Sequence, residues 1–142
     1  MRKDIKDIVA YYKRKTGTND PFKIADFLHI QLQVGDLGTR SGCYMYLKRN
    51  KCIFLNESLE GQEKKIVMAH ELGHAILHPK ENCYFIRDKT LLLNSKTEIE
   101  ANKFAAELLI PNEVLLENWQ LTITQIARLT GYSEELVKLR LN

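Results

Sequence analysis

Three of the four histidines in the chain fall within the nine residues 70–78. Two of them, His70 and His74, frame the pattern H-E-x-x-H. Residues four apart on a helix share one face at about 6 Å, so both rings can direct a nitrogen at one metal ion. Glu71 then flanks that ion without being a ligand. The pattern predicts a zinc site that activates water for hydrolysis, with Glu71 as the general base.

The helix that carries this motif is predicted to be central and buried. Apolar side chains cover most of its circumference between residues 66 and 77. A carboxylate buried there without a partner is expensive, and a nearby cation compensates for it. The alternative is that these are core histidines satisfied by backbone carbonyls. That alternative suits a lone histidine better than it suits this spacing.

His78 does not fit as a third histidine ligand. In metzincins that ligand follows the second histidine by six residues, after a glycine, whereas His78 follows His74 by four. On a straight helix His78 lies about 12 Å along the axis from His70, too far for both to reach one ion. We therefore expect His78 at the rim of the site or in contact with a ligand.

A catalytic zinc needs a third protein ligand, and the helix predicted at residues 95–110 offers Glu98 and Glu100 as candidates. At 100° per residue, Glu98 falls on the apolar face of this helix. Glu100 falls with Lys103 and Glu107 on a face whose composition is typical of solvent exposure. Glu98 is therefore the expected ligand and Glu100 the weaker candidate.

The neighbours of Glu98 support this choice. Small residues such as Ala101 let the helix approach the motif helix closely at Gly73. Asn102, one turn after Glu98, is expected to hold the free N–H of a histidine ligand. One alternative stays open, because Ser95 and Glu98 also fit a capping box in which the carboxylate would bond to the Ser95 amide.

The remaining elements follow from hydrophobic periodicity. Helices are predicted at residues 4–15, 21–28, 59–78, 95–110, 112–118, 122–130 and 133–141. Strands are predicted at residues 30–34, 43–47 and 52–56, the last two as a β-hairpin. The expected fold class is α+β, with a small antiparallel sheet on a zincin-like helix and a helical C-terminal part. We expect one domain over residues 1–142, divided into N-terminal helices and sheet (1–58), zinc-binding helices (59–111) and C-terminal helices (112–142).

Composition and charge suit an ordinary globular protein. The chain has 142 residues, of which 44% are hydrophobic and 27% are charged, and its net charge is +3. Such values argue against disorder and do not favour a nucleic-acid or membrane surface. The start of the chain lacks an apolar leader and no segment is long enough to span a bilayer, so a cytoplasmic location is expected. Cys43, Cys52 and Cys83 form no C-x-x-C pair and are expected to be free buried thiols.

Residues 70–74 (H-E-L-G-H) and 98–111 together resemble the ImmA/IrrE family of zinc metallopeptidases, in its phage and mobile-element form. The resemblance extends less specifically over most of the chain. It implies a gluzincin-like site with one zinc ion held by His70, His74 and Glu98, and Glu71 as the general base. Asn102 stands where related peptidases often have an aspartate, which is a mild departure.

The resemblance also implies a substrate. Family members are understood to cut a partner repressor so that silenced genes turn on. A helix-turn-helix repressor is therefore the expected protein substrate, and derepression of phage or mobile-element genes is the expected outcome. The strand at residues 52–56, just before the motif helix, is expected to be the sheet edge on which the substrate adds as a further strand. His78 and Tyr84 are the candidates for the oxyanion donor.

Two other functions remain as alternatives. Residues 125–138 have the Ala and Gly spacing of a helix-turn-helix, as in a DNA-binding regulator. Glu134 and Glu135 would face phosphates at the start of its recognition helix, so a packed helical hairpin is favoured and direct nucleic-acid binding is not expected. The other alternative is a zinc- or repressor-binding protein that does not cleave. Trp119 is expected to anchor the C-terminal helices on the core.

Overall fold

A computed structural model of the chain describes residues 4–86 and 95–142. The helices are α1 (Ile5–Thr16), α2 (Pro21–Phe27), α3 (Gly61–Leu77), α4 (Lys96–Leu109), α5 (Asn112–Glu117), α6 (Ile123–Thr130) and α7 (Glu134–Leu141). The strands are β1 (Gln31–Gly35), β2 (Arg40–Leu47), β3 (Asn50–Asn56) and β4 (Cys83–Ile86). The α+β class and the predicted helices are confirmed, with ends within about two residues of the expected ones.

The four strands form one sheet in the order β1-β3-β2-β4. The predicted hairpin is confirmed, because β2 pairs antiparallel with β3, and β4 pairs antiparallel with the other side of β2. The expectation of a wholly antiparallel sheet is wrong, since β1 pairs parallel with β3. The tight turn of Lys48 and Arg49, both at positive φ, accounts for the pairing of β2 with β3. The parallel pair arises because β1 lies on the far side of β3 instead of beside β2, the strand that follows it in the chain.

The strand order changes the expected substrate edge. β3 lies between β1 and β2, so both of its sides are paired. The expectation that residues 52–56 form a free edge is therefore wrong. In the described part of the sheet the edges are β1 and β4.

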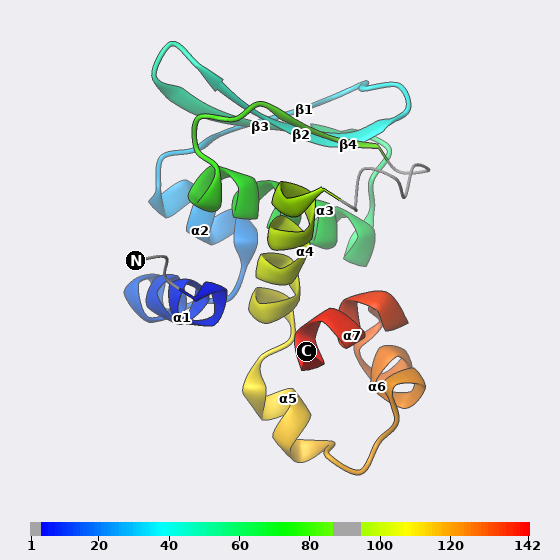
Figure 1. Cartoon of the computed structure of the whole chain (residues 1–142). Coiled ribbons are helices and arrows are strands. Elements are labelled where there is room, and N and C mark those ends of the chain that lie inside the picture. The colour runs from blue at the N-terminus through cyan, green and yellow to red at the C-terminus, as the bar shows by residue number, and fades with distance from the viewer. Residues whose placement is uncertain (1–3, 87–94) are drawn as a thin grey trace.

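Helix α3 lies along one face of the sheet, and α4 crosses α3 and runs away from the sheet (Figure 1). Tyr44, Ile53 and Leu55 point from the sheet toward α3 and are completely buried. The approach is closest at Gly42 of β2. A Cβ atom there would lie 2.8 Å from Cγ1 of Val67 on α3, closer than such contacts allow.

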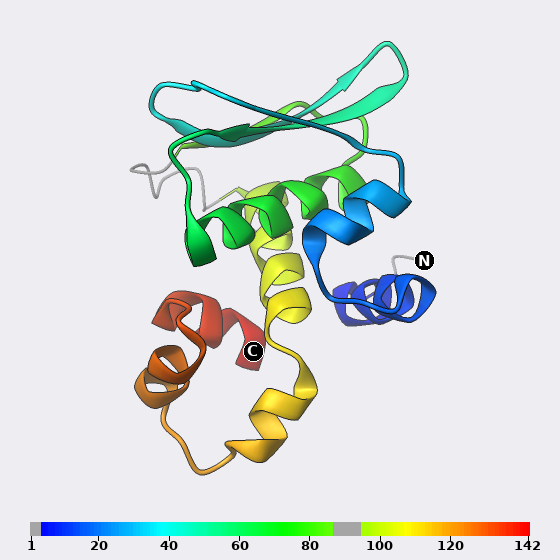
Figure 2. The ribbon, with the colours of Figure 1, turned by 180° about the vertical axis from the view of Figure 1, so that it is seen from behind.

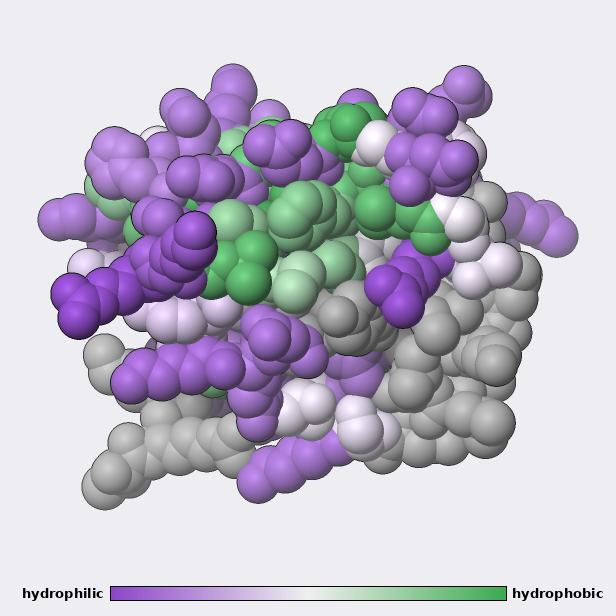
Figure 3. Space-filling model, turned by 90° about the horizontal axis from the view of Figure 1, so that it is seen from above, coloured by the Kyte–Doolittle hydropathy of each residue, from purple (hydrophilic) through white to green (hydrophobic). Residues whose placement is uncertain are grey.

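The opposite face of the sheet carries no helix in the described residues, as the reverse view shows (Figure 2). Apolar side chains gather at its centre, surrounded by hydrophilic ones (Figure 3). Cys43 and Cys52 alternate with the inward-facing residues and so point to this face. Both are buried free thiols, as predicted. The side chain of Cys83 lies outside the described residues.

The crossing of α3 and α4 is tight because Gly73 has no side chain. A Cβ atom at Gly73 would lie 3.1 Å from Cβ of Phe104 and 3.2 Å from the carbonyl oxygen of Ala101. The predicted close approach of small residues is confirmed. It sets Glu98, at the start of α4, opposite the motif histidines of α3.

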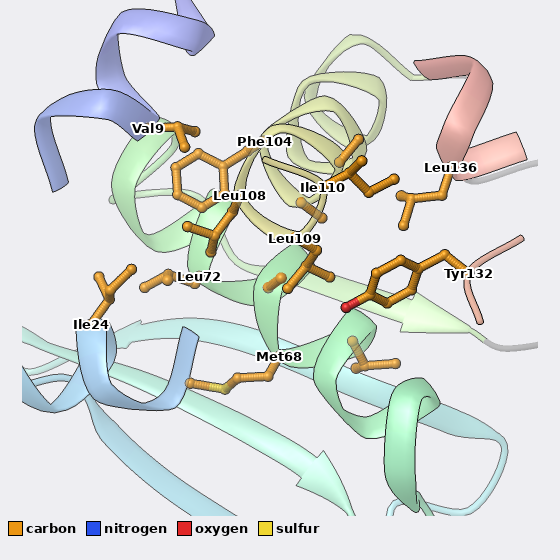
Figure 4. Packing of buried hydrophobic residues seen from close by; sticks show 14 of the residues in the cluster. Val9, Ile24, Met68, Leu72, Phe104, Leu108, Leu109, Ile110, Tyr132 and Leu136 are labelled. Carbon is orange, nitrogen blue, oxygen red and sulfur yellow. The ribbon is translucent and has the colours of Figure 1, made fainter. Parts of the chain in front are cut away.

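One core joins the helices and the sheet (Figure 4). Phe104, Leu108 and Ile110 of the α4 segment are completely buried at its centre. The expectation that Trp119 anchors the C-terminal helices on the core is wrong, because Trp119 is 75% exposed. Tyr132 and Leu136 take that place, since α7 packs against α4.

A buried arginine also ties α7 to α4. Arg140 donates through Nε to the carbonyl oxygen of Ile110 at 2.5 Å, through Nη2 to Oδ1 of Asn112, and through Nη1 to Glu107 at 3.5 Å. We call these four residues the arginine clamp. The expectation that Glu107 lies on a solvated face is wrong for this reason, since α7 covers that part of α4. None of the helices in the described ranges is long and apolar enough to cross a membrane.

Candidate metal centre

Three side chains from two helices meet where α4 crosses α3. His70 and His74 lie one turn apart on α3, and Glu98 lies in the first turn of α4. Nε2 of His70 is 3.2 Å from Nε2 of His74 and 3.4 Å from Oε1 of Glu98. Nε2 of His74 is 2.5 Å from Oε2 of Glu98. We call these three residues the His-His-Glu cluster.

The position of Glu98 decides between the two readings of its side chain. Ser95 caps α4 by accepting a hydrogen bond from the Glu98 amide at 3.3 Å. The Glu98 carboxylate, however, lies against the two imidazoles instead of folding back on Ser95. Burial alone would raise the pKa of Glu98, but the contacts with His70 and His74 outweigh it and bring the pKa to about 2. The carboxylate is therefore ionised at neutral pH.

Both histidines are oriented by partners on their other ring nitrogen. Nδ1 of His70 is 2.7 Å from Oδ1 of Asn102, as the sequence predicts. An amide oxygen only accepts, so Nδ1 of His70 carries a proton and Nε2 is the nitrogen that faces the cluster. Burial lowers the pKa of His74 more than the nearby Glu98 raises it, which favours the neutral form of this ring. Neutral imidazoles and an ionised carboxylate are the forms that bind a metal ion.

The arrangement fits a divalent ion. Ligand atoms of a tetrahedral zinc site lie about 3.4 Å apart, which follows from bonds of about 2.0–2.2 Å. The three donor atoms here all lie within 4.8 Å of one another, and all three residues are buried. Oε2 of Glu98 also has no hydrogen-bond partner, although it lies beside His74. A cation would satisfy this oxygen and separate two nitrogens that point at each other.

Glu71 lies beside the cluster and is completely buried. Neither of its carboxylate oxygens has a hydrogen-bond partner among the described residues. Its Oε2 lies against β2, 3.3 Å from where a Cβ of Gly42 would be. Burial, with the negative charge of Glu98 as a second cause, raises the pKa of Glu71 well above its usual value. A carboxylate with a raised pKa is a stronger base, and a cation at the adjacent metal-binding position would allow it to ionise and accept a proton.

His78 and Glu100 do not belong to the three-donor group. His78 is 8% exposed and lies behind His74, with Nδ1 3.1 Å from Nδ1 of His74. Its Nε2 is 3.0 Å from Oε1 of Glu100. Sequence reasoning missed this role of Glu100 and placed the residue on a solvated face, whereas its side chain is 16% exposed. The four-residue spacing of His74 and His78 could have indicated that their side chains are in contact, because residues four apart share one face of a helix.

Two further residues, Tyr84 and Cys43, belong to the sheet beside Glu71. Tyr84 belongs to β4, which pairs with β2, but its side chain lies outside the described residues. Cys43 lies on β2 near Glu71. Burial and the Glu71 charge raise the pKa of the Cys43 thiol to about 11, against a smaller lowering by Arg40. Cys43 therefore stays protonated and is a poor metal ligand.

In the C-terminal hairpin, α6 and α7 pack against each other and are joined by the short connection 131–133. Gly131 ends α6 in the left-handed conformation, and Ser133 caps α7 by accepting from the Leu136 amide. Glu134 and Glu135 are exposed in the first turn of α7. Their charges face solvent at the end of the helix that DNA would meet.

Comparisons with known proteins agree with this geometry. Residues 25–142 match the Peptidase_M78 family model, described as the IrrE N-terminal-like domain. The chain is 39% identical over 139 residues to the uncharacterized immunity region protein 2 of Bacillus phage phi105, covering 96% of this chain and 88% of that protein. It is 31% identical over 142 residues to the metallopeptidase ImmA of Bacillus subtilis (strain 168), covering 99% of this chain and 79% of that protein.

Proposed function

Because this chain belongs to the metallopeptidase family with the IrrE N-terminal-like domain, we propose that it is a zinc-dependent endopeptidase that cleaves a helix-turn-helix repressor. The family makes it a metallopeptidase with a protein substrate. One observation carries the rest of the proposal. His70, His74 and Glu98 direct three donor atoms at one point, beside a Glu71 carboxylate whose oxygens have no hydrogen-bond partner.

In this proposal His70, His74 and Glu98 hold one zinc ion. When bound, zinc polarises the scissile carbonyl group and lowers the pKa of water. Glu71 takes a proton from the attacking water and delivers it to the nitrogen of the leaving amine. Asn102 keeps the His70 ring in the tautomer that leaves Nε2 free.

The substrate segment is proposed to add to the sheet at β4. Glu71 packs under β2, and β4 is the neighbour of β2 on the edge side in the described part of the sheet. An extended segment paired with β4 would be separated from β2, the strand that covers Glu71, by β4 alone. Backbone pairing of this kind accepts many sequences, so contacts outside the strand would select the partner.

The repressor substrate rests on the family resemblance and on one relative. That relative is named for an immunity region of a phage. Cleavage of a DNA-bound repressor in the cytoplasm would turn on the genes it silences. The exposed Glu134 and Glu135 of α7 speak against DNA as the direct partner of this chain.

The test is metal content, measured by mass spectrometry on protein purified without chelator. We expect one zinc ion per chain in the wild type, and loss or strong weakening of binding in Glu98→Ala. Glu57→Ala is the matched control, because Glu57 is an exposed carboxylate outside the cluster. A wild type that neither contains nor takes up zinc would contradict the zinc site. Incubation with purified repressors from the same genetic element then tests the substrate, with cleavage read by intact mass.

A further inference from the structure

His78 is attached to His74 through both its backbone and its side chain. It ends α3, and its backbone N–H donates to the carbonyl oxygen of His74 at 2.8 Å. The two rings lie 5.3 Å apart between centroids, with Nδ1 of one 3.1 Å from Nδ1 of the other. On its far side Nε2 of His78 reaches Oε1 of Glu100 at 3.0 Å. Glu100 comes from α4, so this contact spans the same helix pair as the His-His-Glu cluster.

The contacts of the four ring nitrogens connect metal binding by His74 to Glu100. Two nitrogens 3.1 Å apart form a hydrogen bond only if one carries a proton and the other offers a lone pair. When Nε2 of His74 binds a metal ion, Nδ1 of that ring carries the proton and needs an acceptor. Nδ1 of His78 is placed to be that acceptor, and Nε2 of His78 then donates to Oε1 of Glu100.

We propose that His78 and Glu100 are a positioning pair for the metal site, which holds His74 in the tautomer whose Nε2 can bind the ion. The inference rests on the proposed metal centre and adds two residues to it. Each histidine of the cluster then has its own acceptor. Asn102 holds His70 directly, and the Glu100 carboxylate holds His74 through the His78 ring.

The alternative, that His78 is itself a ligand or an oxyanion donor, fits the geometry less well. Both of its ring nitrogens are engaged, and its side chain is 6% exposed. Among the described residues, the group that could share one ion contains His70, His74 and Glu98 without His78. A residue that acts through His74 should alter metal affinity, whereas an oxyanion donor should alter only turnover.

Four variants test the pair by separating its contacts. His78→Leu removes both ring nitrogens, whereas His78→Asn keeps an acceptor oxygen near the position of Nδ1. Glu100→Leu removes the carboxylate, whereas Glu100→Gln keeps an acceptor of the same size without the charge. Glu57→Gln is the control, because it removes an exposed carboxylate away from the site.

Metal affinity is measured by competition between each protein and a chromophoric chelator for zinc, with thermal melting of the metal-free proteins beside it. We expect His78→Leu and Glu100→Leu to bind zinc about 10-fold to 100-fold more weakly, which is usual when the partner of a ligand histidine is lost. His78→Asn and Glu100→Gln should each recover part of that loss. If the leucine variants do not fold, the asparagine and glutamine variants still carry the comparison against Glu57→Gln.

A second readout needs no variant. The nitrogen-15 chemical shifts of the imidazoles in the wild type report which ring nitrogen carries the proton. With zinc bound, we expect His74 to carry the proton on Nδ1 and His78 to carry it on Nε2. A proton on Nδ1 of His78 in the zinc-loaded protein, or unchanged zinc affinity in the folded His78 and Glu100 variants, would overturn the pairing while leaving the zinc site intact. A wild type that binds no zinc would instead remove the proposed function, and this inference with it.

Discussion

Helix α4 has a buried polar cluster at each end, and the two clusters differ in how well they are satisfied. In the arginine clamp at the C-terminal end, each of the three guanidinium nitrogens of Arg140 has an acceptor. At the N-terminal end, the His-His-Glu cluster and its neighbour Glu71 leave three carboxylate oxygens without a hydrogen bond to any described residue. Arg140 and Glu107 of the clamp are 6% and 7% exposed, close to the 6% of Glu98, whereas Asn112 of the clamp is exposed.

The difference separates a structural cluster from a functional one. A buried polar group without a partner costs stability, and folding alone gives no reason to keep it. The clamp is closed on itself and ties α7 to α4. The His-His-Glu cluster needs something that the chain does not supply, which fits a metal ion and a reacting water. The two clusters should therefore respond in opposite ways to substitution.

The largest expected effect is on turnover, in Glu71→Gln. Glutamine keeps the shape of the side chain but cannot accept the proton of the attacking water, and general bases contribute about 10²-fold to 10⁴-fold to rate. Cleavage of the repressor should fall by that factor, measured as the initial rate of product formation by intact mass. Zinc content should stay at the wild-type level, because Glu71 is not in the three-donor group. A variant that still cuts at the wild-type rate would end the assignment of Glu71.

The next effect is on stability, in Arg140→Ala. This change leaves the Glu107 carboxylate and the Ile110 carbonyl buried without their partner. Losing one member of a buried ion pair typically costs about 3–5 kcal/mol in the free energy of unfolding. Urea denaturation of the zinc-loaded protein measures it. Lys138→Ala is the control, since Lys138 lies exposed on the same helix. If Arg140→Ala lost zinc affinity while keeping its stability, the division between the clusters would be wrong.

A smaller effect depends on pH. Replacing Glu71 should stabilise the metal-free protein, whereas replacing Arg140 destabilises the protein. Burial raises the pKa of Glu71 in the folded, metal-free protein above its usual value of 4.5. The folded state then binds this proton more tightly than the unfolded state does. The contribution of Glu71 to the free energy of unfolding is therefore fully present below about pH 4.5 and is lost as pH rises through the pKa of the folded state. Glutamine does not titrate. Metal-free Glu71→Gln should therefore gain stability over the wild type between about pH 5 and pH 8, by about 1 kcal/mol.

The measurement is urea denaturation of both proteins at the two pH values after chelator treatment. His74 titrates identically in the two proteins to a first approximation, so the difference between them isolates Glu71. A difference that stays constant with pH would mean that Glu71 is not held protonated by burial.

Much of the candidate site could be predicted from the sequence because its geometry is local. The spacing of His70 and His74, and the phase of Glu98 on its helix, depend only on helical periodicity. The faces of α4 further along could not be assigned in the same way. Glu107 and Glu100 look like solvated residues by pattern, yet Arg140 and His78 cover them from other elements.

The sheet shows the same limit. Alternating residues identify the strands, and the short turn at Lys48 and Arg49 pairs β2 with β3, but neither shows on which side of this pair β1 lies. In the structure β1 lies beside β3 and runs parallel to it. The residues before the motif helix therefore predict a strand, but they do not predict whether this strand lies at an edge of the sheet.

Trp119 supplies the smallest expected effect and a reference for both clusters. A tryptophan usually indicates a core anchor, but this one is 75% exposed. Within the described residues, no hydrogen bond or ion pair joins it to either cluster. Trp119→Ser should change the free energy of unfolding by less than about 0.5 kcal/mol, as exposed substitutions do, and leave zinc affinity unchanged. Phe104→Ala, at the centre of the core, should cost about 3–5 kcal/mol under the same urea titration.

Because Trp119 is the single tryptophan of the chain, the fluorescence of the wild type tests its exposure directly. Its emission should already be that of a hydrated indole in the folded protein, and a neutral quencher should reach it about as well as in urea. Strong protection from the quencher would show that this side chain is covered in solution. A covered Trp119, together with a large loss of stability in Trp119→Ser, would show that this side chain packs in the core. Exposed Trp119 with unchanged stability would leave Tyr132, Leu136 and the arginine clamp as the contacts that hold the C-terminal helices on α4.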